Sequence, residues 1–369
     1  MTVFNTATKL SQRSRAAAHP AAPDFDYLRD EVAARLVGRL RDITRAFPTA
    51  LDLGSNSGNV LAQLLAQRRE GEAGAGGVAE LHAVDACAGM HARSAAAHAG
   101  GAARAGLALH TVAAPLEGAP LPFEDASMDL VLSSMALHWV NDVPGLLAEV
   151  RRVLRPDGAF LAAFLGGDTL QELRCAPLHP AQQRAMGALL RPAPPPTQPF
   201  TRATTTTTTT PCAPPRSLCS SAAEQERDGG VSPRVSPMMR VADAGNLLAG
   251  AGFGLPLVDA DTFTIEYPSP AALFEHLRAM GGSNAALGAR QGARRDTLLA
   301  TAAAYTALYG DAEGRVPATF QVVYMIGWAP AATQPRAKAR GSVPKGFQAR
   351  AAKAPAAAPA APAPAAAAQ

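Results

Sequence analysis

One stretch of this chain constrains its fold more than any other: a short apolar run that ends in an acid and enters a loop of small residues. The stretch reads Ala50-Leu-Asp-Leu-Gly-Ser-Asn-Ser-Gly-Asn59, and a second short apolar run, further along the chain, ends in Asp85. In doubly wound sheets, ligands bind beyond the carboxyl ends of the parallel strands, where the chain turns from a strand into a helix. The arrangement therefore predicts a parallel sheet that holds an adenosine-containing ligand at these two strand ends.

The spacing of the glycines favours one class of adenosine cofactor. The loop reads Asp52-x-Gly54-x-x-x-Gly58, which is not the dinucleotide pattern Gly-x-Gly-x-x-Gly. The helix N-terminus behind the loop suits the carboxylate of S-adenosylmethionine (SAM), and the acid before the loop suits its amino group. Asp85 stands where a carboxylate accepts hydrogen bonds from a ribose diol. We therefore predict SAM rather than NAD; the alternative is that these are ordinary turn residues of a doubly wound fold.

Asn56 departs from the usual SAM loop pattern, Asp-x-Gly-x-Gly-x-Gly, because it stands at the middle glycine. Asparagine accepts a left-handed backbone more readily than other non-glycine residues, so the turn can form. Its side chain would nevertheless crowd a ligand that lies close to the loop. We count Asn56 and its neighbour Ser55 among the cofactor-binding residues, and expect the departure to weaken the affinity or to change the ligand's pose.

Strand-like and helix-like segments alternate along the chain, which is typical of a parallel sheet covered by helices on both faces. The spacing of apolar residues predicts helices over 26–47, 60–67, 143–154, 241–251, 271–280 and 295–309. It predicts strands over 50–53, 81–85, 107–112, 128–133, 159–165, 262–267 and 319–328. The predicted fold class is therefore a doubly wound, Rossmann-like α/β fold.

Composition divides the chain into five parts. Residues 1–23 carry bases and no acids, and are expected to be a disordered N-terminus or the remnant of a transit peptide. Residues 24–175 form the predicted SAM-binding core, and 223–330 form the C-terminal part of the same domain. Between them, 176–222 are rich in Pro and Thr and are expected to be a disordered insertion. An Ala/Pro-rich basic tail over 331–369 is also expected to be disordered.

The charge distribution argues against a nucleic-acid partner. The formal net charge is +4, but the basic excess lies in the two ends, and the part between them is acidic overall. A nucleic-acid binder needs a basic face on its folded domain. No apolar run reaches the roughly 18 residues of a membrane-spanning helix, so no span is expected. The four cysteines form no Cys-x-x-Cys pair and no zinc spacing with His, so no metal site is predicted.

Side chains around the fourth predicted strand are candidates for both sides of the site. Ser133 ends this strand beside the expected cofactor, and Glu117, in the segment before it, is the available acid for the adenine amine. His138 is either a general base near neutral pH or a polar group that covers the pocket. Trp139 is either a substrate-facing aromatic or a side chain packed under the next helix.

Asp168 follows the fifth predicted strand, within Gly166-Gly-Asp-Thr-Leu-Gln-Glu-Leu-Arg174. Together with its charged neighbours it could bind a cationic or guanidinium substrate. The alternative is that Asp168 caps the helix that follows. His138 and Asp168 are therefore the candidate catalytic residues, and Trp139 joins them on the substrate side.

Five segments of the chain resemble the mitochondrial respiratory complex I assembly factor 5 family, which is related to the methyltransferase of early biotin synthesis. They are Phe25–Val32, Leu51–Gly54, Leu137–Asp142, Gly166–Cys175 and Val316–Trp328. The resemblance covers roughly 24–175 and 223–330, and in the loop this chain has Ser-Asn-Ser where the family has Cys-Gly-Arg. It implies a class I methyltransferase fold, with a seven-stranded, mostly parallel sheet whose last strand is antiparallel.

The resemblance also implies a function. Members of this family act early in complex I assembly and are regarded as hydroxylating an arginine of a core complex I subunit. It therefore implies a mitochondrial matrix enzyme, peripheral to the inner membrane, with SAM as cofactor and a core complex I subunit as protein partner. The implied activity is the hydroxylation or methylation of an arginine. Two alternatives remain: a non-catalytic assembly chaperone, and a SAM-dependent methyltransferase that acts on a small molecule or an acyl-carrier protein.

Overall fold

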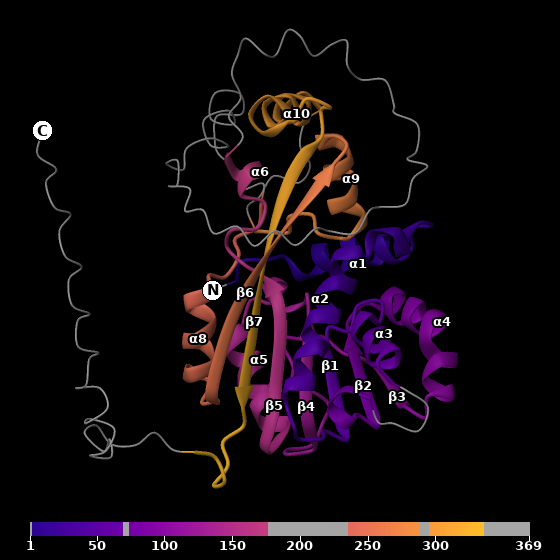
Figure 1. Ribbon diagram of the computed structural model, residues 1–369, viewed down its shortest axis with the longest axis vertical. Coiled ribbons are helices and arrows are strands. Elements are labelled where there is room, and N and C mark those ends of the chain that lie inside the picture. The colour runs from indigo at the N-terminus through magenta and orange to yellow at the C-terminus, as the bar shows by residue number, and fades with distance from the viewer. Residues whose placement is uncertain (1, 69–73, 176–234, 288–294, 336–369) are drawn as a thin grey trace, which may run out of the picture. The chain divides into compact units, whose positions relative to one another are not determined.

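The sheet of this protein follows the strand order β3-β2-β1-β4-β5-β7-β6 (Figure 1). The computed structural model describes residues 2–68, 74–175, 235–287 and 295–335. The chain divides into two units, 1–331 and 332–369, and every element described below belongs to the first. The expected insertion at 176–222, and all but the first residues of the expected tail, lie outside the described residues.

The strands confirm the predicted sheet. They are β1 Thr49–Leu53, β2 Glu80–Asp85, β3 Ala108–Ala113, β4 Met128–Ser134, β5 Leu154–Leu165, β6 Gly254–Tyr267 and β7 Val316–Trp328. Strands β1 to β5 pair in parallel, and β7 runs antiparallel to both of its neighbours, β5 and β6. The strand order turns back between β1 and β4, so the switch point of the doubly wound fold lies beside Asp52.

Helices connect these strands. The α-helices are α1 Thr6–Ala17, α2 Tyr27–Gly38, α3 Asn59–Ala66, α4 Ala88–Arg104, α5 Val143–Val153, α6 Gln171–Cys175, α8 Val241–Gly250, α9 Pro270–Ala279 and α10 Arg295–Tyr309. Short 3-10 helices are η1 Ala22–Phe25, η2 Arg39–Asp42, η3 Ala75–Gly77 and η4 Leu137–Trp139. No helix in the described ranges has the length and apolar character needed to cross a bilayer.

Alternate strand residues face two apolar cores, as expected for a sheet buried on both sides. Ala50, Leu130 and Leu132 face the core that includes residues of α2 and α3. Leu51 and Val131, one position along, face the core that includes residues of α5 and α8. Because side chains alternate along a strand, Asp52 lies on the same face as Ala50, the face that α2 covers.

The hairpin of β6 and β7 extends beyond β5. β7 pairs with β5 only from Val322 onward, whereas Val316–Gln321 pair with Thr262–Tyr267. The expected strand at 262–267 is therefore only the second half of β6. Helices α9 and α10 lie between β6 and β7 in sequence, so they stand at the carboxyl ends of the parallel strands (Figure 1). That edge is where ligands bind in sheets of this class.

The N-terminal segment differs from the expected disorder of residues 1–23, because Thr6–Ala17 form α1. The helix is capped by Asn5, whose Oδ1 accepts from the backbone N–H of Thr8 at 2.9 Å. Leu10 is the only large aliphatic side chain of α1, and it is exposed. Polar contacts hold the helix in place, and a search for hydrophobic periodicity cannot detect such contacts.

Two other helices also differ from the prediction. The helix expected over 26–47 ends as an α-helix at Gly38 and continues only as the short η2. Helix α4 was not expected, because Ala and Gly dominate its sequence and leave only a weak apolar pattern.

Candidate functional site

The loop between β1 and α3 turns tightly against the end of β2. Gly54 and Gly58 have φ values of +71° and +84°, a backbone conformation that glycine adopts without strain. The N–H groups of Gly54 and Ser55 both donate to the carbonyl oxygen of Val84, at 2.8 and 3.1 Å. A Cβ atom at Gly54 would lie 2.3 Å from the Cβ of Ala136. Both glycines singled out in the sequence are therefore required by the geometry of the turn.

Asn56 keeps the left-handed turn, with a φ of +50°. Its Nδ2 donates to the carbonyl oxygen of Gly54 at 2.8 Å and to that of Ser134 at 3.0 Å. The side chain thus connects the loop after β1 to the end of β4, across the switch point of the sheet. Its backbone N–H donates to Oδ2 of Asp85 at 3.0 Å.

Asp52 has a buried carboxyl group. The residue is 1 % exposed, and among the described residues neither carboxyl oxygen has a hydrogen-bond partner. Burial, and then the charge of Asp85, raise the pKa of Asp52 to about 8. A buried acid in this condition gains free energy from any donor or cation that reaches it. The prediction that Asp52 binds the cofactor is compatible with this environment, in which its carboxyl group is free to accept a hydrogen bond.

Three more buried polar groups near this strand edge also lack a partner within the described part of the chain. They are the hydroxyl of Ser55, the hydroxyl of Ser134 and Nδ1 of His138. Buried polar groups nearly always have a hydrogen-bond partner in folded proteins. Four such groups around the carboxyl ends of β1 and β4 indicate a polar ligand as their common partner, and a SAM molecule fits that requirement.

Asp85 is fully buried and accepts three hydrogen bonds. Its Oδ1 accepts from the backbone N–H of Cys87 at 2.8 Å, and its Oδ2 accepts from Asn56 and from the guanidinium of Arg13, the latter at 2.5 Å. Arg13 lies on α1 and also donates to Oδ1 of Asn56 at 2.9 Å. The acid expected to hold the ribose is thus paired with a residue of the N-terminal helix.

Two predicted cofactor residues take part in other bonds. The Ser133 hydroxyl donates to the carbonyl oxygen of Leu53 at 2.8 Å and so links β4 to β1. The Glu117 carboxylate accepts from the backbone and side chain of Asn141, at 2.7 and 2.8 Å, and from the backbone of Asp142. Contacts of Ser133 and Glu117 with the cofactor therefore stay predictions, and Ser134 has the hydroxyl that is available to a ligand.

His138 and Trp139 lie under α1. Lys9 of α1 places its Nζ 3.0 Å from the centre of the Trp139 ring, and the ring of Phe4 meets the same indole edge-on at 5.4 Å. Burial, followed by the charges of Lys9, Arg29 and Arg13, lowers the pKa of His138 well below its usual value. The imidazole of His138 is therefore neutral near pH 7, where it can accept a hydrogen bond but is a weaker base than an ordinary histidine.

Asp168 lies apart from His138 and is exposed. Its Oδ2 accepts from Nε2 of Gln321 at 2.9 Å, and its neighbour Thr169 donates to the backbone carbonyl of the same Gln321. Glu172 accepts hydrogen bonds from the backbone N–H and the hydroxyl of Thr319. These bonds join the Gly-Gly-Asp-Thr-Leu motif at 166–170 to the Pro-Ala-Thr-Phe-Gln motif at 317–321. Asp168 is part of this junction.

Sequence reasoning missed Asp26, which binds Ser57 of the loop between β1 and α3. Its carboxylate accepts from the Ser57 hydroxyl at 2.9 Å and from the guanidinium groups of Arg29 and Arg93 at 2.8 and 2.6 Å. The residue lies in the Phe25–Val32 segment that carries the resemblance, which was the only signal for it. Lys9 and Arg13 were missed because they lie in the stretch that was expected to be disordered.

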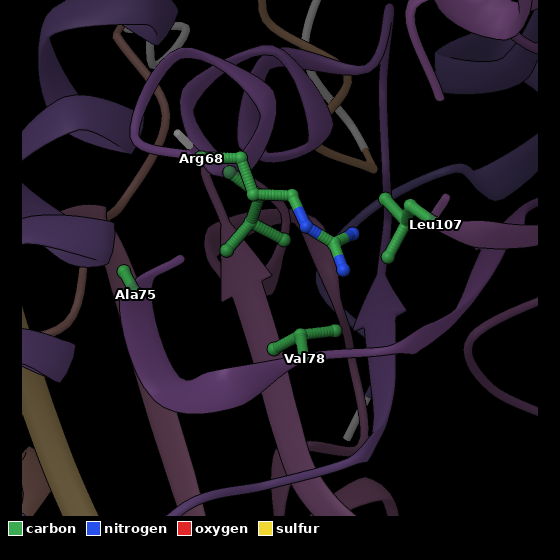
Figure 2. Close-up of a pocket in the computed structure, with 5 residues that line it drawn as sticks. Arg68, Ala75, Val78 and Leu107 are labelled. Atoms are coloured by element: carbon green, nitrogen blue, oxygen red, sulfur yellow. The ribbon is translucent and has the colours of Figure 1, made fainter. Parts of the chain in front are cut away.

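A separate small cavity lies at the opposite edge of the sheet. It is lined by Leu64, Arg68, Ala75, Val78 and Leu107 (Figure 2). Val78 lies two residues before β2 and Leu107 immediately before β3, so the cavity is at the amino ends of the strands. It is lined by none of the predicted site residues. Within the described ranges, no three His, Cys, Asp or Glu side chains are grouped so that they could hold a metal ion.

Known proteins are similar to this chain over most of its length. Residues 51–162 match the family model described as "Methyltransferase domain". The human protein named "Arginine-hydroxylase NDUFAF5, mitochondrial" is 35% identical over 347 residues, which cover 94% of this chain and 83% of that protein. The Danio rerio protein of the same name is 34% identical over 348 residues, 94% of this chain and 89% of that protein.

One more distant relative is named as a methyltransferase, and one solved structure aligns over much of the chain. A "Malonyl-[acyl-carrier protein] O-methyltransferase" of Halorhodospira halophila is 30% identical over 317 residues, 86% of each chain. The crystal structure of YcgJ from Bacillus subtilis aligns with a TM-score of 0.46 at 14% identity, over 81% of this chain and 99% of that one. The matched domain contains the loop and both acids, and SAM is the cofactor of such domains. The chain therefore belongs to the NDUFAF5 family of arginine hydroxylases, enzymes that contain a methyltransferase domain.

Proposed function

We propose that this protein binds SAM and modifies an arginine of a core complex I subunit, by hydroxylation or methylation, during the assembly of complex I. The observation that carries the proposal is the group of unpartnered buried polar atoms on Asp52, Ser55, Ser134 and His138. They surround the strand ends of a methyltransferase domain, in a chain that is 35% identical to a human protein named as an arginine hydroxylase.

Each part of SAM has a candidate partner in this chain. Asp52 would accept from the amino group, and that positive charge would favour its ionised form, whose pKa burial has raised to about 8. Asp85 would accept from the ribose hydroxyls, and the hydroxyls of Ser55 and Ser134 would bond to the remaining polar atoms. When bound, SAM supplies an electrophilic methyl group. Positioning that group against its acceptor is the main contribution the protein can make to a methyl transfer.

On the substrate side, His138 would accept a hydrogen bond from the arginine, because its lowered pKa keeps the ring neutral. The guanidinium would also approach Lys9, whose burial lowers its pKa well below the usual value and so makes its charged form less favourable there. Asp168, at the junction of the two motifs, would lie further out and contact the protein substrate.

Family membership supports a mitochondrial location, since the human and Danio rerio relatives are both named as mitochondrial. We propose that the protein acts in the matrix, at the inner membrane, where a core complex I subunit would be met during assembly.

The test is to rescue cells that lack this protein with wild type, Asp52→Asn or Asp24→Asn. Asp24 is an exposed acid of η1, so its variant is a matched control for the loss of one carboxylate. Mass spectrometry of the arginines of core complex I subunits should find the added oxygen atom or methyl group with wild type and the control, and lose it with Asp52→Asn. An unchanged modification with Asp52→Asn would overturn the proposal.

One observation favours a non-catalytic assembly chaperone as the second candidate. Arg13 is already paired with the Asp85 carboxylate, and Asn56 bonds across the switch point to Ser134. Both contacts lie where the cofactor is expected to bind. Normal complex I assembly in cells rescued with a folded Asp52→Asn/Asp85→Asn double variant would favour this candidate. A methyltransferase of acyl-carrier proteins is the third candidate, supported by the Halorhodospira halophila relative. Complementation of a strain that lacks the early biotin methyltransferase would test it.

A further inference from the structure

Helix α1 and the expected cofactor compete for the same carboxylate. Resting on the proposed binding of SAM, we propose that α1 is a displaceable plug: Arg13 occupies the position on Asp85 that the ribose hydroxyls require, and the cofactor releases α1 when it binds. The juxtaposition is direct, since Arg13 lies 2.5 Å from Asp85 Oδ2 and 2.9 Å from Asn56 Oδ1.

The number of hydrogen bonds that Asp85 can accept shows why Arg13 and the ribose diol cannot both bind it. A carboxylate offers about four lone-pair positions. The backbone N–H groups of Cys87 and Asn56 take two of them, and Arg13 takes a third. A ribose diol brings two hydroxyl donors, and only one position remains. Arg13 must leave Asp85 before the diol can bind with both hydroxyls.

The remaining contacts of α1 are those of an element that can be displaced. Only Lys9 and Ala16 of the helix are buried, and Leu10, its one large aliphatic residue, is 39 % exposed. Docking therefore removes little apolar surface from water, which is the main favourable contribution to packing. The attachment of α1 is consequently mostly polar, and the salt bridge of Arg13 with Asp85 and its bond to Asn56 are part of it, together with the bond from Gln12 to the carbonyl oxygen of Asn284.

Lys9 makes the docked position less stable. Its ammonium is buried against the carbonyl oxygens of Gly281 and Ser283, at 2.7 and 3.2 Å, and against the Trp139 ring. No carboxylate pairs with it among the described residues. Removing a charged amine from water without an ionic partner is unfavourable, so release of α1 returns Lys9 to solvent at a gain in free energy.

The same movement uncovers the substrate side. Lys9 and Phe4 cover Trp139, and the ring of Trp139 lies against His138. Displacement of α1 by the cofactor would therefore uncover the face of Trp139 that Lys9 covers, while Phe4, which precedes α1, is held separately by Asn141 and Ala286. Because α1 covers the substrate side until the cofactor displaces it, the cofactor would bind first and the protein substrate second.

The experiment combines amide hydrogen exchange of residues 6–17 with calorimetric titration of SAM, on full-length wild type, Arg13→Gln and Arg15→Gln. Arg15 is the matched control, because it lies on the same helix, is exposed and, among the described residues, bonds only to the Ser11 carbonyl. We expect Arg13→Gln to speed exchange in α1 without any ligand and to bind SAM about tenfold more tightly, the effect of losing one charge-assisted bond. Arg15→Gln should change neither, and SAM should speed α1 exchange in wild type.

The outcomes separate this proposal from the proposed function. If wild type binds SAM, but Arg13→Gln binds it no more tightly or SAM slows exchange in α1, the plug is overturned while SAM binding stands. If neither protein binds SAM although exchange in β1, β4 and β5 shows an intact sheet, the proposed function fails and the plug fails with it. Should Arg13→Gln unfold, Asp85→Asn breaks the same salt bridge from its other end: α1 exchange should rise and SAM affinity should fall, and unchanged α1 exchange would overturn the plug.

Discussion

At the scale of single residues, Asn56 is the departure with the most direct consequence for the cofactor. Its side chain spans the switch point by donating to the carbonyl oxygens of Gly54 and Ser134. We expect Asn56→Gly to bind SAM about tenfold more tightly, because glycine adopts the same positive φ and removes both the bridge and the obstruction. Isothermal titration measures the change. Equal affinities would show that the amide and the cofactor do not compete for space.

The buried acid Asp52 predicts a dependence of stability on pH. Its pKa is raised from 3.8 to about 8, so between these values the folded protein holds a proton that the unfolded chain has released. This group's contribution to the free energy of unfolding therefore falls as the pH rises through that window. Relative to Asp52→Asn, which has the same shape and no charge, wild type should lose up to about 1.4 kcal/mol per pH unit.

Urea unfolding of the two proteins at several pH values between about 5 and 8 checks this, because the difference between them removes every titration they share. A difference that stays constant with pH would mean that Asp52 is already ionised in the folded protein. A difference that grows in favour of wild type would reverse the expected sign.

At the scale of elements, the junction of α6 with β7 predicts a stability effect far from the cofactor. The buried carboxylate of Glu172 accepts from the backbone N–H and the hydroxyl of Thr319. Thr319→Val keeps the shape of the side chain and removes the hydroxyl, which leaves Glu172 with one donor fewer. We expect a loss of about 1–3 kcal/mol in the free energy of unfolding.

The strand pairing supplies a control for this variant. Thr264 of β6 lies opposite Thr319 in the register and is exposed, so Thr264→Val should change the free energy of unfolding by less than about 0.5 kcal/mol. Guanidinium titrations of both variants provide the comparison. Equal losses in the free energy of unfolding would mean that the bond from Thr319 to Glu172 does not stabilise the fold.

The elements also show how far the sequence could predict the fold. Strands β1, β2, β4 and β5 bury apolar residues on both faces, and their continuous apolar runs are readable without a structure. Helix α1 was not predictable in that way, because polar contacts of Arg13 and Gln12 and the Asn5 cap set its position. Asp85 and Asn284, the partners of Arg13 and Gln12, lie far along the chain, and no local pattern reveals them.

The candidate site was readable in part for the same reason. Asp52, Gly54, Gly58 and Asp85 follow strands in a fixed order, so their meeting at one edge follows from the parallel sheet. By contrast, the choice of Ser134 rather than Ser133 as the hydroxyl available to a ligand depends on which of them bonds to Leu53. The register between β4 and β1 decides which serine bonds to Leu53, and this register cannot be read from the sequence.

At the scale of the whole molecule, binding of the cofactor should raise thermal stability in a way that identifies the ligand. A ligand that binds only the folded state stabilises it by about 2.7 kcal/mol at one hundred times its Kd. We expect SAM to raise the midpoint of unfolding in differential scanning calorimetry, and NAD at the same concentration to leave it unchanged. Asp85→Asn should lose most of the shift. A shift with NAD and none with SAM would reverse the assignment of the loop.

The bridge between Gly166 and Met239 has a consequence for the evolution of this chain. These two residues pair directly although they lie far apart in sequence, so their pairing fixes two points of the chain and not the number of residues between them. When a flexible loop closes between two fixed points, the entropy cost grows only with the logarithm of its length, at about 0.6 kcal/mol for each doubling. Residues gained or lost after α6 and before Met239 would then cost little free energy, and we expect length variation among homologues to concentrate there.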